Sequence, residues 1–464
     1  MTLETWPSPH SVNAVTVALE DSEEVDMLDL ATPTGVVYAG PELAFSGIGT
    51  AVRLALPRGL SDPETLASLV PWLAAVPHDD HVHGSGTGTK VTALGALAFD
   101  PSAPGWLTVP HVLFGRDRNG RRWATVVGSA RTRGRDPLQV VADTARSAAA
   151  ETRRLDPGGN RAPDPQTVSV RAFPDGNGYR RAVARAIELI GTGRIVKVVL
   201  ARTVVVDIDR PPRLHRVLAR LRQHEPACTV FSFGTDEGTF LGASPELLVR
   251  RRESNVTSMP LAGTMAIGSE VPRTPSGSAH PLETSEKDHA EHDIVVDAVV
   301  STLRAYCDDV ALPEGTVLVQ LGSLAHLGTR VHGTLRTGHG VRPSALELAA
   351  ALHPTPAVGG SPRPEALDLI AQLEPASRGQ WAGPVGWVDA AGDGEWMVGI
   401  RSATIVGQRV TMTAGAGIVS GSDPDAELAE TTVKFGPVLA ACCPGSSPIA
   451  RSGAQGPHEH PPVT

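Results

Sequence analysis

The chain has 464 residues, of which 41% are hydrophobic and 20% are charged, a composition typical of a globular protein with one large domain or two ordinary ones. Its 41 basic and 50 acidic residues give a formal net charge of −9, which argues against nucleic acids and anionic membranes as partners held by general electrostatic attraction. An anionic substrate must therefore be bound by a few local cations or by a metal ion.

The cysteines and the N-terminal sequence bear on the cellular location. The four cysteines have neither the spacing of a zinc site nor that of a disulfide framework: Cys228, Cys307, Cys442 and Cys443. The first residues, MTLETWPSPHSV, lack a basic segment followed by an apolar one, and no apolar run approaches the roughly 18 residues of a membrane span. We therefore expect a cytoplasmic protein without a signal peptide or a membrane span.

The first third of the chain predicts strands, turns and one helix. Up to about residue 100, short apolar segments such as TGVVYAG and TALGALAFD alternate with Gly and Pro. The segment HDDHVHGSGTGTK (78–90) predicts neither a metal site nor a phosphate-binding loop, because polar His-rich tracts are usually surface loops and the GxxxxGK[ST] spacing is missing. A helix is predicted over 136–156, and PGGNRAPDP (157–165) ends it. We therefore expect an N-terminal region, 1–165, packed as part of the same fold as residues 166–443.

The following segment places a lysine inside an apolar strand. A helix over 178–193 precedes IVKVVLART (195–203), which has the composition of a fully buried strand except for Lys197. Burial of an ammonium group costs desolvation free energy and favours the neutral amine, which can accept a proton. The alternative is a lysine on an edge strand whose ammonium extends to solvent.

The rest of the sequence alternates strands with helices and predicts an α/β protein. Strands are expected at 228–234, 238–243, 246–251, 384–389, 396–405 and 409–414. Helices are expected at about 288–305, 344–352 and 424–440. The tail, 444–464, is rich in Pro, Gly and Ser and is expected to be disordered.

Two of these helices carry pairs of acidic residues at helical spacing. Asp288 and Glu291 share one helical face, and Glu427 and Glu430 share another. Such a pair is most often the solvated face of an amphipathic helix. If the four carboxylates converge, a set without His or Cys suits a hard cation such as Mg²⁺.

Glycines and one arginine suggest a site for an anion. MPLAGTM (259–265) and TAGAGIVSGSDP (413–424) are expected to be strand ends where backbone N–H groups approach an anion. GEWMVGIRSATI (394–405) predicts a strand with Arg401 in its middle. A buried arginine requires an anionic partner, and a substrate carboxylate would form a bidentate pair with it.

A series of motifs spans roughly residues 170–440: KVVLAR, GASPELLVR, PLAGT, SEKDHAEH, LHPTPAVGG, WAGPVGW, GDGEWMVGIRSA, TAGAGIVSGSDPDAELAET and KF. Their sequences and their order resemble those of the chorismate-utilising enzymes, a family that includes anthranilate synthase component I, aminodeoxychorismate synthase, salicylate synthase and isochorismate synthase. The resemblance implies an α/β (α+β) fold of large antiparallel sheets flanked by helices, with a chorismate-binding catalytic domain at 166–443.

The resemblance also implies an acid–base pair. Ammonia-using members carry glutamine at the position of Lys197, whereas water-using members carry a lysine that deprotonates the attacking water. Glu246 in SPEL would be the general acid that protonates the departing C4 hydroxyl, and partial desolvation would raise its pKa for that task.

A metal and a substrate set follow from the same resemblance. Glu291 and Glu430 would bind Mg²⁺ directly, with Asp288 and Glu427 nearby, and the ion would neutralise the ring carboxylate of chorismate. The implied substrate contacts are Arg401, Lys434 and the Gly415 backbone as a carboxylate clamp, Gly263 and Thr264 beside the metal-bound carboxylate, and His326, Ala357 and Trp381 around the ring. Trp381 stands where relatives usually have Tyr or Phe.

Single positions select the expected reaction. Ala262 replaces the nucleophilic lysine of many aminodeoxychorismate synthases, and Lys197 replaces the amination glutamine, so an amine product is not expected. Ala357 matches isochorismate synthases, whereas salicylate synthases carry threonine there. We expect a Mg²⁺-dependent isochorismate synthase, a monomer or weak dimer whose product serves menaquinone, siderophore or salicylate formation. The alternatives are a salicylate synthase and a non-catalytic chorismate-binding protein.

Overall fold

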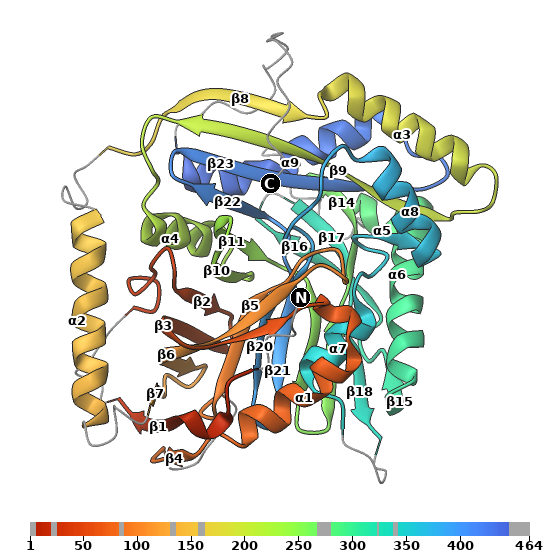
Figure 1. Cartoon of the computed structure of the whole chain (residues 1–464). Coiled ribbons are helices and arrows are strands. Elements are labelled where there is room, and N and C mark those ends of the chain that lie inside the picture. Colours follow the sequence, from red (N-terminus) through yellow and green to blue (C-terminus); the bar gives the residue numbers. More distant parts are fainter. Residues whose placement is uncertain are drawn as a thin grey trace.

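The computed structural model describes residues 6–19, 26–82, 88–129, 136–155, 163–266, 280–322, 324–336 and 342–444 (Figure 1). Residues 83–87 of the His-rich segment, most of the predicted break at 157–165, and the predicted disordered tail beyond residue 444 lie outside the described residues.

The α-helices of the described residues are α1 (Pro63–Ala74), α2 (Pro137–Leu155), α3 (Gly176–Ile190), α4 (Leu214–His224), α5 (Pro281–Thr284), α6 (Glu286–Arg304), α7 (Ala345–Leu352), α8 (Arg363–Leu373) and α9 (Pro424–Cys442). The strands of the first half are β1 (Val12–Ala18), β2 (Val36–Ala39), β3 (Leu43–Leu56), β4 (His78–Asp80), β5 (Thr92–Ala96), β6 (Gly105–Asp117), β7 (Arg122–Ser129), β8 (Thr167–Phe173), β9 (Lys197–Ile208) and β10 (Thr229–Thr235). The later strands are β11 (Gly238–Ser244), β12 (Leu247–Arg252), β13 (Asn255–Met259), β14 (Leu261–Ala266), β15 (Cys307–Ala311), β16 (Thr316–Leu321), β17 (Leu324–Thr329), β18 (Val331–Leu335), β19 (Gly360–Ser361), β20 (Pro384–Asp389), β21 (Gly394–Val398), β22 (Ser402–Val406) and β23 (Arg409–Ile418).

One continuous hydrogen-bonded sheet contains strands from both halves of the chain. One row of neighbours runs β8–β9–β23–β22–β11–β10–β2–β3–β6–β7–β1–β4. A second row, β15–β18–β13–β12–β21–β20–β5, joins the first at β6. Every described pair in these rows is antiparallel except β1 and β4, and β14, β17 and β16 form a separate small sheet. Helices flank the sheets, and this arrangement confirms the predicted fold class (Figure 1).

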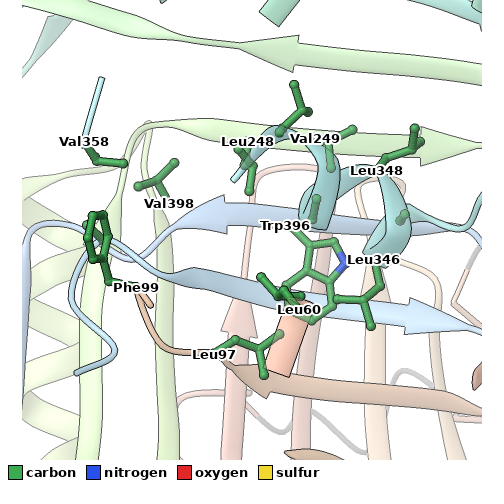
Figure 2. Packing of buried hydrophobic residues seen from close by; sticks show 14 of the residues in the cluster. Leu60, Leu97, Phe99, Leu248, Val249, Leu346, Leu348, Val358, Trp396 and Val398 are labelled. Atoms are coloured by element: carbon green, nitrogen blue, oxygen red, sulfur yellow. The ribbon is translucent and has the colours of Figure 1, made fainter. Parts of the chain in front are cut away.

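The largest apolar core packs helices against the sheets. It includes residues from α1, α3, α6, α7 and α8 together with inward-facing residues of β9, β12 and β21. Figure 2 shows the part in which the Trp396 ring lies among leucine side chains of distant segments. None of the described helices combines the length and the apolar character that a membrane span requires.

Strand β9 carries the unexpected lysine, and its sequence explains its position. The run KVVLARTVVVDI is rich in β-branched residues and pairs with β8 on one side and β23 on the other. Lys197 is the first residue of the strand, and none of its surface is exposed. The strand is therefore central and buried, and the alternative of an edge-strand lysine that reaches solvent is wrong.

Some predicted elements differ from the structure. Helix α1 lies in a region that was predicted to contain only strands and turns. The sequence did contain a signal for its start, because Asp62 caps the helix by accepting a hydrogen bond from the Thr65 N–H at 3.3 Å. The predicted strand 396–405 is interrupted at residues 399–401, because β21 pairs with β12 and β20 while β22 pairs with β11 and β23. Arg401 is therefore not in the middle of a strand. It lies in the break, with a φ of 52°.

Candidate active site

A cavity of ≈ 440 Å³ opens between the small sheet, the start of α6, strand β23 and the start of α9. Residues from segments far apart in the sequence line this cavity together. Those among the predicted site residues are Glu246, Gly263, Thr264, Asp288, Glu291, His326, Ala357, Trp381, Arg401, Gly415, Glu427, Glu430 and Lys434.

Lys197 is the one predicted site residue that lies behind the wall of this cavity. Its Nζ is 2.9 Å from Oε1 of Glu291, which does line the cavity. The contact is an ion pair without hydrogen-bond geometry, so the ammonium has no hydrogen-bond acceptor among the described residues. Gly417 of β23 leaves room for both groups, because a Cβ there would lie 2.3 Å from the Glu291 oxygen and 3.1 Å from Cε of Lys197. A buried donor of this kind needs a water or a ligand to complete its hydrogen bonding.

Glu246 lies between β11 and β12 with 3% of its surface exposed. Its backbone carbonyl accepts a hydrogen bond from the Val398 N–H at 3.0 Å, which fixes the turn at the cavity wall. Burial raises the pKa of Glu246 to about 8, although the nearby charges of Lys197 and Lys434 act in the opposite direction. The carboxyl group is therefore mostly protonated at neutral pH and can donate a proton.

The four predicted metal-binding acids lie within the first two turns of α6 and α9. Asp288 and Glu291 come from α6, and Glu427 and Glu430 come from α9. Burial raises the pKa of Glu427, and the carboxylates of Glu430 and Glu291 raise it further, so the acids of the two helices repel one another. Within the described part of the chain, no three His, Cys, Asp or Glu side chains are arranged as a metal site.

Lysines neutralise three of these acids in the structure. Besides the Lys197–Glu291 pair, Nζ of Lys434 lies 2.6 Å from Oε1 of Glu430, and Nζ of Lys287 lies 3.4 Å from Oε1 of Glu427. Sequence analysis did not identify Lys287, although it stands beside Asp288 in SEKDHAEH and lines the same cavity. The sequence signal that could have identified Lys287 is its position between Glu286 and Asp288, in the motif that carries two of the predicted metal-binding acids.

Arg401 lines the cavity, and one nitrogen of its guanidinium has no hydrogen-bond acceptor among the described residues. Its side chain is 5% exposed, and its Nη2 donates to Nε2 of His326 at 2.7 Å. Nη1 has no hydrogen-bond partner within the described residues, and it lies 3.9 Å from Oε1 of the buried Glu225. A buried cation with a free N–H group is suited to bind an anionic ligand.

His326 connects Arg401 to the glycine segment of β14. Burial and the charges of Arg401 and Lys434 hold the pKa of His326 well below its usual value, so the ring is neutral. Its Nδ1 lies 3.1 Å from the Gly263 carbonyl, which can only accept, so Nδ1 carries the proton and Nε2 accepts from Arg401. Nδ1 is also 3.2 Å from the Thr264 hydroxyl.

At two glycines of the cavity wall, Gly263 and Gly415, a larger residue would come too close to a neighbouring side chain. Gly263 has a φ of 66°, and a Cβ at this position would lie 3.2 Å from Cβ of Asp288. Gly415 was predicted near a strand end, but it lies inside β23, where a Cβ would meet the Trp381 ring at 3.0 Å. The Gly415 carbonyl accepts a hydrogen bond from Nζ of Lys434 at 3.0 Å.

Comparison with known proteins identifies related sequences and structures. The family described as "Chorismate binding enzyme" matches residues 40–443. The chain is 39% identical over 284 residues to the isochorismate synthase DhbC of Bacillus subtilis, a match that covers 59% of this chain and 70% of the relative. It is 36% identical over 366 residues to the putative isochorismate synthase MenF of Mycobacterium tuberculosis, covering 76% of this chain and 87% of the relative.

A solved structure extends the likeness over almost the whole chain. The putative 2,3-dihydroxybenzoate-specific isochorismate synthase DhbC from Bacillus anthracis superimposes with a TM-score of 0.70 at 29% sequence identity. The superposition covers 89% of this chain and 98% of the other.

Proposed function

The chain belongs to the family of chorismate-binding enzymes, and we propose that it is an isochorismate synthase that converts chorismate to isochorismate by adding water at C2 and removing the C4 hydroxyl. The observation that carries the proposal is that a buried lysine, Lys197, and a buried glutamic acid whose pKa is raised, Glu246, both lie at one cavity. Water enters and water leaves, so the reaction is a reversible isomerisation. The relatives named isochorismate synthase support it.

Lys197 and Glu246 carry out the two proton transfers. Lys197, as the general base, takes a proton from the water that attacks C2, and the ring double bonds shift as the C4–O bond breaks. Glu246 gives its proton to the departing hydroxyl. Burial of Glu246 supplies the acid form at neutral pH, which is the requirement for a general acid.

The cationic residues of the cavity hold the dianionic substrate. Arg401, with its free Nη1, and Lys434 bind a substrate carboxylate, together with the backbone at Gly415. Neutral His326 orients Arg401 and stands beside Gly263 and Thr264, where the second carboxylate binds. Trp381 and Ala357 border the ring.

The carboxylates of α6 and α9 fit a hard cation, because they are oxygen donors gathered at one cavity and they repel one another. Glu291 and Glu430 would hold Mg²⁺, with Asp288 and Glu427 beside it. When bound, the ion neutralises the ring carboxylate of chorismate. We propose that the protein acts in the cytoplasm, in keeping with its four free, buried cysteines, and that it is a monomer or a weak dimer.

The pH dependence of kcat/KM tests the role of Glu246. The acid must be protonated, so activity is present below its pKa and is lost as the pH rises through it. We expect an alkaline limb with an apparent pKa of about 8. Glu246→Gln removes the proton donor and should lower kcat by roughly 10²–10⁴-fold. A steady-state pH profile of both proteins measures this, and an unchanged alkaline limb in Glu246→Gln would assign the limb to another group.

Product analysis tests the reaction itself and separates it from the salicylate synthase alternative. A lyase must hold isochorismate so that the C2 hydrogen reaches the enolpyruvyl methylene while the ether bond breaks. Ala357 lines the cavity and offers no hydroxyl for that pose. We expect purified protein with chorismate and Mg²⁺ to release isochorismate without stoichiometric pyruvate, and Ala357→Thr to gain some pyruvate release.

The assay couples pyruvate to lactate dehydrogenase and follows isochorismate by chromatography. A sample of isochorismate without enzyme measures spontaneous breakdown. Stoichiometric pyruvate from the wild type would identify a salicylate synthase, and an absence of any chorismate turnover would favour a non-catalytic binding protein.

A further inference from the structure

The guanidinium of Arg378 lies behind the wall of the active-site cavity, between two segments that line it. Its side chain is 3% exposed. Nη1 donates to the Val358 carbonyl at 2.7 Å, and Nη2 donates to the Val199 carbonyl at 2.8 Å. Val199 belongs to β9, two residues after Lys197, and Val358 follows Ala357. Both valines line the cavity, so one side chain joins the strand of the proposed base to the loop beside the substrate ring.

A buried acid completes this connection. Nε of Arg378 donates to Oε2 of Glu374 at 2.8 Å, and Nη2 contacts Oε1 of the same carboxylate. Oε1 also accepts a hydrogen bond from the Ala201 N–H at 2.8 Å. The arginine therefore holds β9 at residue 199 and its partner acid holds the same strand at residue 201. Backbone position along this strand is what sets the location of Lys197.

Arg378 also packs against aromatic rings, one of which borders the cavity. The guanidinium carbon lies 5.1 Å from the centroid of the Trp381 ring and 4.2 Å from that of Phe99. The Trp381 N–H donates to the Arg378 carbonyl at 3.0 Å, which adds a backbone link to the cation–π contact. Phe99 and Val358 lie near each other at one end of the core cluster in Figure 2. The Trp381 ring in turn reaches the space above Gly415.

We propose that Arg378, with Glu374, is a positioning residue that fixes the Lys197 strand, the Ala357–Val358 loop and the Trp381 ring relative to one another; this inference rests on the proposed function. The main physical reason for assigning a positioning role is that a buried ion pair contributes little net stability compared with apolar packing. Its directional hydrogen bonds do, however, favour one relative position of the segments that they join. Three parts of one catalytic wall meet at this one guanidinium, and small displacements of catalytic groups are costly to turnover.

Arg378→Lys tests the proposal, because lysine keeps the charge and loses both the planar face and the fork of donors. We expect kcat to fall by about 10–100-fold while KM changes much less, since neither Arg378 nor Glu374 lines the cavity. Glu374→Gln keeps the shape and the acceptor for the Ala201 N–H, and it should give a smaller loss of the same kind. Glu374→Gln also provides a second test if Arg378→Lys folds poorly.

Arg252→Lys is the matched control. The guanidinium carbon of Arg252 lies 4.9 Å from the centroid of the Trp387 ring, and Nη1 donates to the Gly394 carbonyl at 3.1 Å. Arg252 therefore makes the same two kinds of contact as Arg378, a cation–π contact and a hydrogen bond to a backbone carbonyl, with residues that do not line the cavity. Thermal unfolding, kcat and KM are measured for all three variants. Equal losses of kcat in Arg378→Lys and Arg252→Lys at similar melting temperatures would overturn the positioning role, as would a change confined to KM.

Failure of this inference is distinguishable from failure of the proposed function. Wild-type conversion of chorismate is measured first in the same assay. A wild type without turnover contradicts the proposed function, whereas an active wild type whose kcat is unaffected by Arg378→Lys and Glu374→Gln contradicts the positioning role alone.

Discussion

Lys197→Ala and Lys197→Gln are expected to fold and to lose about 10²–10⁴-fold in kcat, the range typical of general base catalysis. The physical reason is that the attacking water loses its proposed proton acceptor, an amine that is fully buried at the start of β9 with its Nζ 2.9 Å from Oε1 of the cavity acid Glu291. Alanine removes the amine altogether. Glutamine keeps a polar group of similar length but cannot accept a proton at neutral pH. Steady-state turnover of chorismate, followed as isochorismate, measures the loss.

Two controls separate catalysis from folding. Lys90→Ala removes a positive charge from an exposed position and should leave turnover unchanged. Thermal unfolding of each Lys197 variant shows whether the loss of its ion pair with Glu291 has unfolded the protein. If a folded Lys197→Ala or Lys197→Gln variant turned over at the wild-type rate, Lys197 would have no part in the mechanism.

Removal of divalent metal is expected to abolish turnover, and added Mg²⁺ should restore it. Neutralising a substrate carboxylate supplies several kcal/mol of transition-state stabilisation, so a loss above about 100-fold is expected. Glu430→Gln should weaken Mg²⁺ binding, because it removes a charged oxygen ligand from the set of four acids. Isothermal titration with Mg²⁺ measures binding directly, and the EDTA-treated enzyme assayed with and without Mg²⁺ measures the dependence.

The matched control for the metal is Asp297→Asn, which neutralises an exposed acid on α6, about two turns beyond Glu291. Its Mg²⁺ affinity and turnover should match the wild type. Full turnover after exhaustive treatment with EDTA would show that these carboxylates serve another purpose. Equal weakening in both variants would point to a general effect of net charge.

The helices with strong periodicity and clear ends could be predicted from sequence. The helices α2, α3, α6, α7 and α9 lie where their apolar spacing and flanking residues place them, with small shifts at the ends. Helix α1 was missed because Gly- and Pro-rich surroundings suggested strands and turns. The predicted strand through Arg401 is wrong because its apolar run continues across a point where the chain changes sheet neighbours. The local sequence of a strand does not show which other strand pairs with it.

The sequence by itself determined the family, through motifs in a specific order, and the identity of each side chain available to the site. It also indicated that Lys197 is unusual, since the amino-acid sequence alone shows a lysine within an apolar strand.

The tertiary structure decided which groups meet. It places acids of α6 and α9, 139 residues apart from Glu291 to Glu430, on one cavity, and it puts Lys197 behind the wall rather than in it. It also shows Glu225 and Arg378 behind the cavity. The reason is physical: the pKa of Glu246, the free N–H of Arg401 and the contacts of Arg378 depend on burial and on neighbours from distant segments, and folding brings these together.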